Sequence, residues 1–230
     1  ENIGLDYFPL DTARLRFFGG TSNHWAGWSR PLDASDFLPN PVNPWSGWPI
    51  SKADLDPYAA ETDAILDIPF HYHLSAAQRL TSLGIDMLWI GDDVGAQDSM
   101  IISPQTWRRF LKPRLATFIA EVKSINPKLK IAYHSDGKVD DIIPELIEIG
   151  LDVLNPIQPL CMDPAVLKKK YGRDLCFWGS IDEQKTLPFG TAEDVRQEVL
   201  LRLRTIGRGG GLIVGPTHNV QLATPMEKFW

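Results

Sequence analysis

The chain has 230 residues, of which 43% are hydrophobic and 23% are charged, so it is long enough to bury a core and falls in the range of globular proteins. Its net charge of −6 and the absence of a basic stripe exclude a nucleic-acid or anionic-membrane partner. The sequence contains neither a run of roughly 20 apolar residues nor a signal peptide, so we expect a cytoplasmic protein. Because its two cysteines form no paired motif, we expect no disulfide.

The first 70 residues form a distinct, loop-rich segment. They contain four of the eight tryptophans and eight of the eighteen prolines, and residues 1–75 contain 4 Lys and Arg against 10 Asp and Glu. Frequent Gly and Pro turn signals predict loops and short strands, with one amphipathic helix over residues 52–66. We predict no independent core for this segment. Glu1 and Trp230 resemble the cut ends of a fragment.

From Leu83 onward, short apolar runs alternate with helical patterns. We predict five strands and four helices, and this alternation indicates a buried parallel sheet in an α/β fold. The predicted strands cover residues 85–90, 130–134, 151–155, 175–178 and 212–215, and the predicted helices cover residues 104–124, 139–149, 164–171 and 192–206.

A polar cluster follows each predicted strand, which favours a barrel over an open sheet. In a (β/α) barrel the carboxyl ends of all strands meet at one face, so the clusters would surround a common pocket. A doubly wound sheet stays open as an alternative, but no Gly-rich phosphate loop follows any strand. We therefore predict an incomplete (β/α)8 TIM-like barrel of about five βα units, preceded by the loop-rich segment.

Five side chains in these clusters are candidate catalytic residues. Asp92 and Asp93 follow the first strand, where one carboxyl with a raised pKa could serve acid-base chemistry. The alternative is that Asp92 caps a turn and only Asp93 points inward. His134 and Asp136 end the second strand, although a strand-end hydrogen bond and a helix cap would also explain them. His218 follows the last strand, where it could donate to a carboxylate or bind a metal.

A second group of polar residues is predicted to bind substrate through hydrogen bonds. The alternative for residues 155–156 is that the Asn-Pro pair only shapes a turn. The predicted substrate-binding residues are Gln97, Asn155, Gln158, Asp182 and Asn219.

Residues 75–230 resemble the uroporphyrinogen decarboxylase superfamily, which also contains corrinoid-dependent methyltransferase subunits. The resemblance rests on GIDMLWIGDDVGAQDSMIISPQTWRRFLKPRL, IAYHSDG, GLDVLNPIQ, FWGSID and GLIVGPTHNVQ. It implies a (β/α)8 barrel, and in its decarboxylase branch a reaction without a cofactor, with His218 in the place of a substrate-contacting His. Asp93 stands where those decarboxylases have a Ser. The family's first strands, with their Arg-rich loop and early Asp, have no counterpart here.

The methyltransferase branch of the same superfamily implies a different site. There the segment around His134 reads His-x-Cys-Gly, and its His and Cys help to bind the zinc that activates a thiol. Here Asp136 takes the place of the Cys, so the resemblance makes zinc a possible cofactor with His134, Asp136 and His218 as its ligands, and makes a corrinoid protein a possible partner.

Residues 1–70 resemble glucose-methanol-choline (GMC) flavin oxidoreductases. The similarity is carried by RLRFFGGTSNHWAGWSRPLDASDF and SGWPISKADLDPYAAETDAILDI. It implies that FAD would contact Gly20, Thr21, Ser22, Asn23 and His24. The Gly-rich dinucleotide-binding unit and the catalytic His pair of that family are missing.

We therefore predict two parts, a GMC-like fragment over residues 1–72 and a partial barrel over residues 73–230. The predicted function is decarboxylation of a carboxylated small molecule or tetrapyrrole, in a fragmentary and chimeric form, most simply without a cofactor. The alternatives are a zinc-dependent corrinoid methyltransferase, an FAD-dependent alcohol or sugar oxidoreductase, and a non-functional fusion. A barrel that lacks strands also predicts an oligomer or a completing partner.

Overall fold

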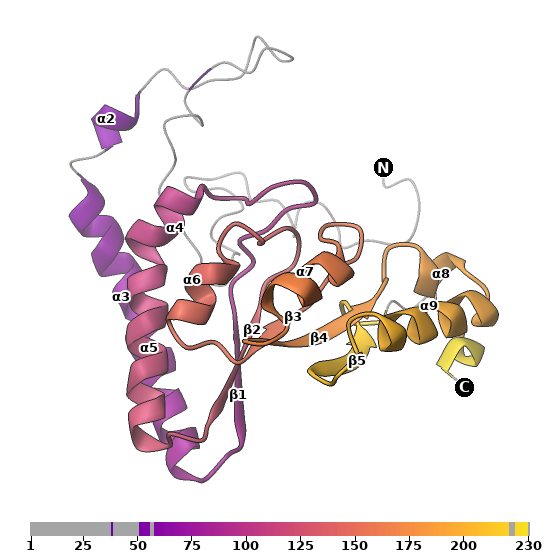
Figure 1. Ribbon diagram of the computed structural model, residues 1–230. Coiled ribbons are helices and arrows are strands. Elements are labelled where there is room, and N and C mark those ends of the chain that lie inside the picture. Colours follow the sequence, from indigo (N-terminus) through magenta and orange to yellow (C-terminus); the bar gives the residue numbers. More distant parts are fainter. Residues whose placement is uncertain (1–37, 39–50, 56–57, 221–223, 230) are drawn as a thin grey trace.

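The computed structural model describes residues 38, 51–55, 58–220 and 224–229 (Figure 1). The flavin-contacting residues that we predicted, Gly20 to His24, lie outside this part of the chain. Among the described residues, none of the helices combines the length and the apolar character that crossing a bilayer requires.

Five parallel strands form one sheet, and their order in the sheet is their order in the sequence. Because each strand pairs with the next one along the chain, every connection crosses back over the sheet, as in a (β/α) barrel. This arrangement confirms the predicted α/β fold with five βα units. The strands are β1 (Met87–Gly91), β2 (Lys130–His134), β3 (Val153–Asn155), β4 (Cys176–Ile181) and β5 (Leu212–Pro216).

Helices connect the strands, and side-chain caps mark several of their starts. The Ser103 hydroxyl accepts a hydrogen bond from the Thr106 N–H, and Thr191 forms a capping box with Asp194. The helices are α2 (Lys52–Leu55), α3 (Ala59–Ser82), α4 (Pro104–Phe110), α5 (Lys112–Ile125), α6 (Ile143–Glu148), α7 (Pro164–Tyr171), α8 (Thr186–Phe189) and α9 (Ala192–Arg204), followed by the 3-10 turn η4 (Met226–Phe229).

One face of the sheet forms the main core. Since strand side chains alternate between faces, Leu88, Ile131, Leu154 and Phe177 share one face, and all four are buried with apolar residues of α5, α6 and α7. The opposite face carries Trp89, which is 56% exposed. The described residues therefore leave this face of the sheet exposed at Trp89, although Ala132 and Val153 beside it are buried.

Helix α3 corrects the helix that we predicted over residues 52–66. It runs from Ala59 to Ser82 with Pro69 inside it, and it packs on α5. The Arg114 guanidinium bonds the carboxylates of Asp63 at 3.1 Å and Asp67 at 2.7 Å across this contact. The helix crosses the predicted boundary between residues 72 and 73 without interruption. That boundary stays a prediction.

Candidate metal centre

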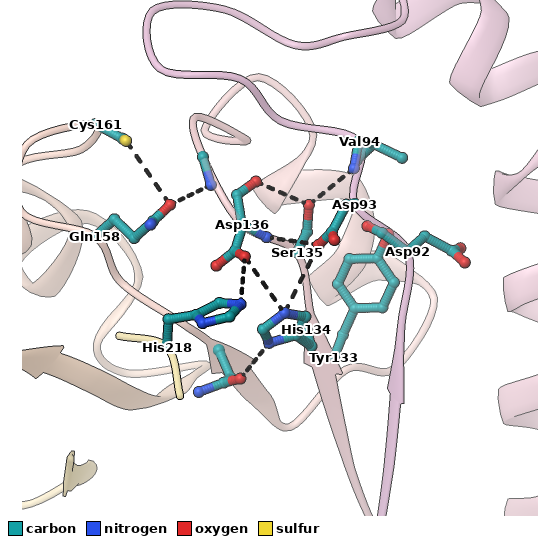
Figure 2. Close-up of polar contacts among 12 residues, drawn as sticks. Asp92, Asp93, Val94, Tyr133, His134, Ser135, Asp136, Gln158, Cys161 and His218 are labelled. Carbon is teal, nitrogen blue, oxygen red and sulfur yellow. Dashed lines mark hydrogen bonds and ion pairs between the residues drawn. The ribbon is translucent and has the colours of Figure 1, made fainter. Parts of the chain in front are cut away.

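The carboxyl ends of β1 and β2 bring three candidate residues together (Figure 2). His134 is the last residue of β2, and its Nε2 lies 3.7 Å from Asp93 Oδ1 and 3.9 Å from Asp136 Oδ2. The Asp136 N–H donates to Asp93 Oδ1 at 3.1 Å, which ties the two loops together. One ligand atom from each of the three residues lies within 4.8 Å of the others, a spacing suited to a single metal ion.

The orientation of the His134 ring follows from a chain of hydrogen bonds. Asn155, at the end of β3, donates through Nδ2 to the carbonyl oxygen of Trp178 at 3.3 Å. Its Oδ1 therefore faces His134 Nδ1 at 2.7 Å and can only accept. In the neutral ring the proton is then on Nδ1, and Nε2, which faces the two carboxylates, has its lone pair free to bind a metal. Metal-binding histidines are commonly fixed in this way.

His218 approaches the same cluster from the loop after β5. Its Nε2 lies 3.6 Å from Asp136 Oδ2, and its side chain is 45% exposed. Figure 2 shows the rings of His218 and His134 both directed at the Asp136 carboxylate. The cluster thus combines two imidazoles and two carboxylates from the ends of three strands.

Asp136 carries the least compensated charge of the cluster. Burial raises the pKa of its carboxyl group and the neighbouring Asp93 adds to the rise, while His134 and His218 oppose it. Its Oδ1 is buried, and no donor in the described part of the chain bonds it. A cation bound here would relieve both the repulsion between carboxylates and the unsatisfied oxygen.

Asp92 lies apart from the cluster, and its predicted roles in catalysis or in capping a turn stay predictions. Its side chain extends away from Asp93 and His134 in Figure 2. The Tyr133 hydroxyl donates to the Asp92 backbone carbonyl at 3.3 Å. Burial and the adjacent Asp93 charge raise the pKa of the Asp92 carboxyl to about 7. The sequence suggested a raised pKa for one carboxyl of the pair Asp92 and Asp93. The raised pKa is that of Asp92, which faces away from His134.

Two of the predicted substrate-binding residues shape the loops around the cluster. Gln158 Oε1 accepts a hydrogen bond from the Gly137 N–H, directly after Asp136. Gln97 donates to the Leu160 carbonyl at 3.2 Å and accepts from Gln184 at 3.0 Å. Both side chains join loops that follow different strands.

Asp182 and Asn219 take different positions. Asp182 is buried, and its carboxylate accepts backbone N–H groups of Gln184, Lys185 and Thr186 at 2.8–3.2 Å, so it holds the turn that begins α8. Asn219 is exposed beside His218. Whether either residue binds a substrate stays a prediction.

Cys161 also lies beside this centre, although no feature of the sequence selected it. Its thiol donates to Gln158 Oε1 at 3.8 Å, and burial together with the charge of Asp136 raises its pKa. A single cysteine in a loop without a motif carries no sequence signal. Cys161 lies beside the metal centre because the turn at residues 158–161 brings its thiol close to the Gln158 side chain.

Known proteins resemble this chain over most of its length. The family model described as Uroporphyrinogen decarboxylase (URO-D) matches residues 50–229. The Methylcobamide:CoM methyltransferase MtaA of Methanosarcina barkeri is 30% identical over 196 residues, which cover 85% of this chain and 52% of that protein. The protein of the same name from M. barkeri strain Fusaro is 29% identical over 194 residues, covering 84% of this chain and 51% of its own length.

A solved structure described as a methyltransferase from Methanosarcina mazei matches with a TM-score of 0.57 and 23% identity. The match covers 72% of this chain and 46% of that one, and it supports the barrel-like fold. This chain therefore spans about half the length of the relatives that it matches.

These matches confirm the superfamily predicted from residues 75–230. The family match begins at residue 50, inside the segment that we assigned to a GMC-like fragment. None of these matches supports the GMC resemblance or a chimeric chain.

Proposed function

Because this chain belongs to the uroporphyrinogen decarboxylase family, we propose that it forms the metal-binding part of a methyltransferase-type active site. One observation carries the proposal: ligand atoms of Asp93, His134 and Asp136 lie within 4.8 Å of one another at the carboxyl end of the sheet. Active sites of (β/α) barrels are built at this end.

The donor set fits a zinc ion. His134 Nε2, Asp136 and Asp93 would hold it, and His218 lies close enough to Asp136 to become a further ligand. Imidazole and carboxylate are both common zinc ligands, and the buried Asp136 Oδ1 lacks a donor among the described residues. A bound zinc would lower the pKa of a substrate thiol and so supply the thiolate that accepts a methyl group.

The chain's own residues prepare this site. Asn155 keeps the Nδ1 proton of His134 away from the carboxylates, and the Asp136 N–H orients Asp93. The Ser135 hydroxyl accepts from the Val94 N–H at 3.1 Å, which fixes the loop after β1 against the loop after β2. The ligand atoms are therefore held by backbone and side-chain bonds before any metal binds.

The names of the relatives suggest the substrates. Methylcobamide and coenzyme M are named for the M. barkeri proteins. For this chain we propose the same reaction class, with a methylated corrinoid on a partner protein as methyl donor and a small thiol as acceptor. The decarboxylation that we predicted from the sequence needs no metal, so metal binding distinguishes the two functions.

The test is metal analysis of the full chain. We expect about one zinc per chain after reconstitution, as a single-site tetrahedral centre requires. His134→Ala should reduce zinc affinity by more than the ~10–100-fold that the loss of a ligand-orienting residue costs. His71→Ala, an exposed residue of α3, is the matched control and should keep the zinc. Equal and weak zinc binding by all three proteins would contradict the proposal and favour the metal-free decarboxylase.

A further inference from the structure

A second polar site lies between helix α7 and helices α8 and α9, beyond Gln158 from the metal centre. It is a cleft of about 570 Å³, lined by the loop over residues 159–164, by the start of α8 and by α9. Figure 1 shows α9 beside the strands β4 and β5 and α8 next to α9. The volume falls in the range of small-molecule sites.

A buried ion pair forms one wall of the cleft. Arg202 Nη2 lies 2.6 Å from Glu198 Oε1, and the two side chains are only 12% and 9% exposed. The Arg202 Nε–H donates to the Ser180 carbonyl at 2.8 Å, and the Asp182 N–H donates to Glu198 Oε1 at 3.4 Å. Both residues line the cleft, so its wall contains a fixed and largely dehydrated carboxylate.

The second carboxylate oxygen of Glu198 has no such support. Oε2 is buried, and in the described parts of the chain no donor bonds it. A buried charged acceptor without a donor is costly, so the site favours a donor from outside the chain. The backbone N–H groups that might have served are taken, because those of residues 184–186 bond Asp182.

The charges around the cleft favour a cation. Three carboxylates line it, those of Asp163, Asp182 and Glu198, against two cations, Lys185 and Arg202. Arg202 is already occupied by Glu198 and Ser180, and Lys185 is exposed. The net charge of the lining is therefore negative, and one of its lining residues, Glu198, carries the unsatisfied acceptor.

We propose that this cleft binds a small organic ammonium compound whose N–H groups donate to Glu198 Oε2. The cleft also contacts the metal centre indirectly, because Cys161 lines it and bonds Gln158, which accepts from Gly137 next to Asp136. The site nevertheless has its own acceptor, so it does not depend on a bound metal.

The test uses n-butylammonium chloride as the probe, added to the full chain after chelator treatment. Thermal unfolding should shift upward with the probe and less with 1-butanol or with NaCl at equal ionic strength. In ¹⁵N–¹H spectra, the probe should change the chemical shifts of the amide signals of residues 161–163 and 185–186. Spectra that change only near residues 93–95 and 136–137 would place the amine at the metal centre and overturn the proposal.

Three variants separate the cleft from the metal centre. Glu198→Gln should weaken n-butylammonium binding about ten-fold or more, the usual effect of removing a charged hydrogen-bond partner. Lys185→Gln, at the exposed edge, should strengthen it, and Asp136→Asn should leave it unchanged. If n-butylammonium stabilises the chain no more than NaCl does, or if it binds Lys185→Gln more weakly than the unaltered chain, the proposal is wrong. These outcomes do not depend on zinc and leave the proposed methyltransferase function to its own test.

Discussion

The two ends of the sheet differ in how they compensate the charge of a half-buried aspartate. At the amino end, Asp152 lies 2.8 Å from Lys123 Nζ and 2.9 Å from Lys130 Nζ, and it also accepts the Ile131 N–H at 3.0 Å. At the carboxyl end, Asp136 has another carboxylate and two imidazoles as neighbours, and its Oδ1 has no donor among the described residues.

The pKa directions express this difference. Burial alone would raise both values, but at Asp152 the hydrogen bonds from Lys123, Ile131 and Lys130 outweigh burial and lower the pKa. At Asp136 burial and Asp93 prevail, and the pKa is raised. The amino end therefore uses a carboxylate to stabilise the fold, whereas the carboxyl end keeps one ready for a ligand.

Asp136→Asn should produce the largest effect, on metal binding. Removing a charged ligand should lower zinc affinity by more than ~100-fold, beyond the cost of losing an orienting partner. The unfolding free energy of the metal-free chain should stay the same or rise by about 1 kcal/mol, because a poorly compensated charge disappears. Chemical denaturation and competitive zinc titration measure the two effects. Loss of stability together with unchanged zinc affinity would mean that Asp136 serves the fold.

Asn155→Leu should give an intermediate effect. The substitution removes the acceptor that keeps the His134 proton on Nδ1, so zinc affinity should fall by ~10–100-fold. Gln97→Leu is a control of the same kind, since Gln97 also bonds a backbone carbonyl near the site but does not touch His134. Equal losses in both variants would show that general loosening of the loops, rather than the orientation of His134, controls zinc affinity.

The strands could be predicted well because they are short, apolar and bounded by turn signals. The predicted limits of β2, residues 130–134, are those observed, whereas β4 continues to Ile181 beyond the predicted end at Trp178. Gly179 and Ser180 looked like the start of a polar loop, but both are buried and pair with β5. Local polarity cannot show that a neighbouring strand extends the pairing.

The candidate site could be predicted in part for the same reason. Strand ends converge in any parallel barrel, so His134, Asp136 and His218 could be grouped without a structure. Which of Asp92 and Asp93 points inward depends on where β1 ends, and a shift of one residue reverses the answer. Glu198 and Arg202 were missed because an i, i+4 pair in a helix looks like an ordinary surface pair until the helix is placed against β4.

Helix α3 shows the limit of a local pattern. The amphipathic pattern predicted a helix that ends at residue 66, but α3 continues through Pro69 to Ser82, although proline disfavours a helix interior. The contact with α5, through Arg114 and the carboxylates of Asp63 and Asp67, lies about 50 positions away in the sequence. Tertiary contacts of this kind stabilise a helix beyond its intrinsic propensity.

Asp152→Asn should give the smallest effect and the one that tests the amino end. The substitution should lower the free energy of unfolding by about 1–2 kcal/mol at neutral pH. The variant keeps an acceptor for the Ile131 N–H but loses two partly exposed ion pairs. The pKa of Asp152 is lower in the folded chain than in the unfolded one. Its contribution is therefore complete above the unfolded pKa of about 4 and is lost as the pH falls through the folded pKa. The difference in unfolding free energy between Asp152→Asn and the unaltered chain should be constant from about pH 5 to 7 and shrink below about pH 4.

The control is Asp174→Asn, at an exposed position, which should change the free energy of unfolding by less than about 0.5 kcal/mol over the same pH range. If the difference for Asp152→Asn does not depend on pH, the ion pairs contribute nothing, and the two ends of the sheet do not differ in the way described.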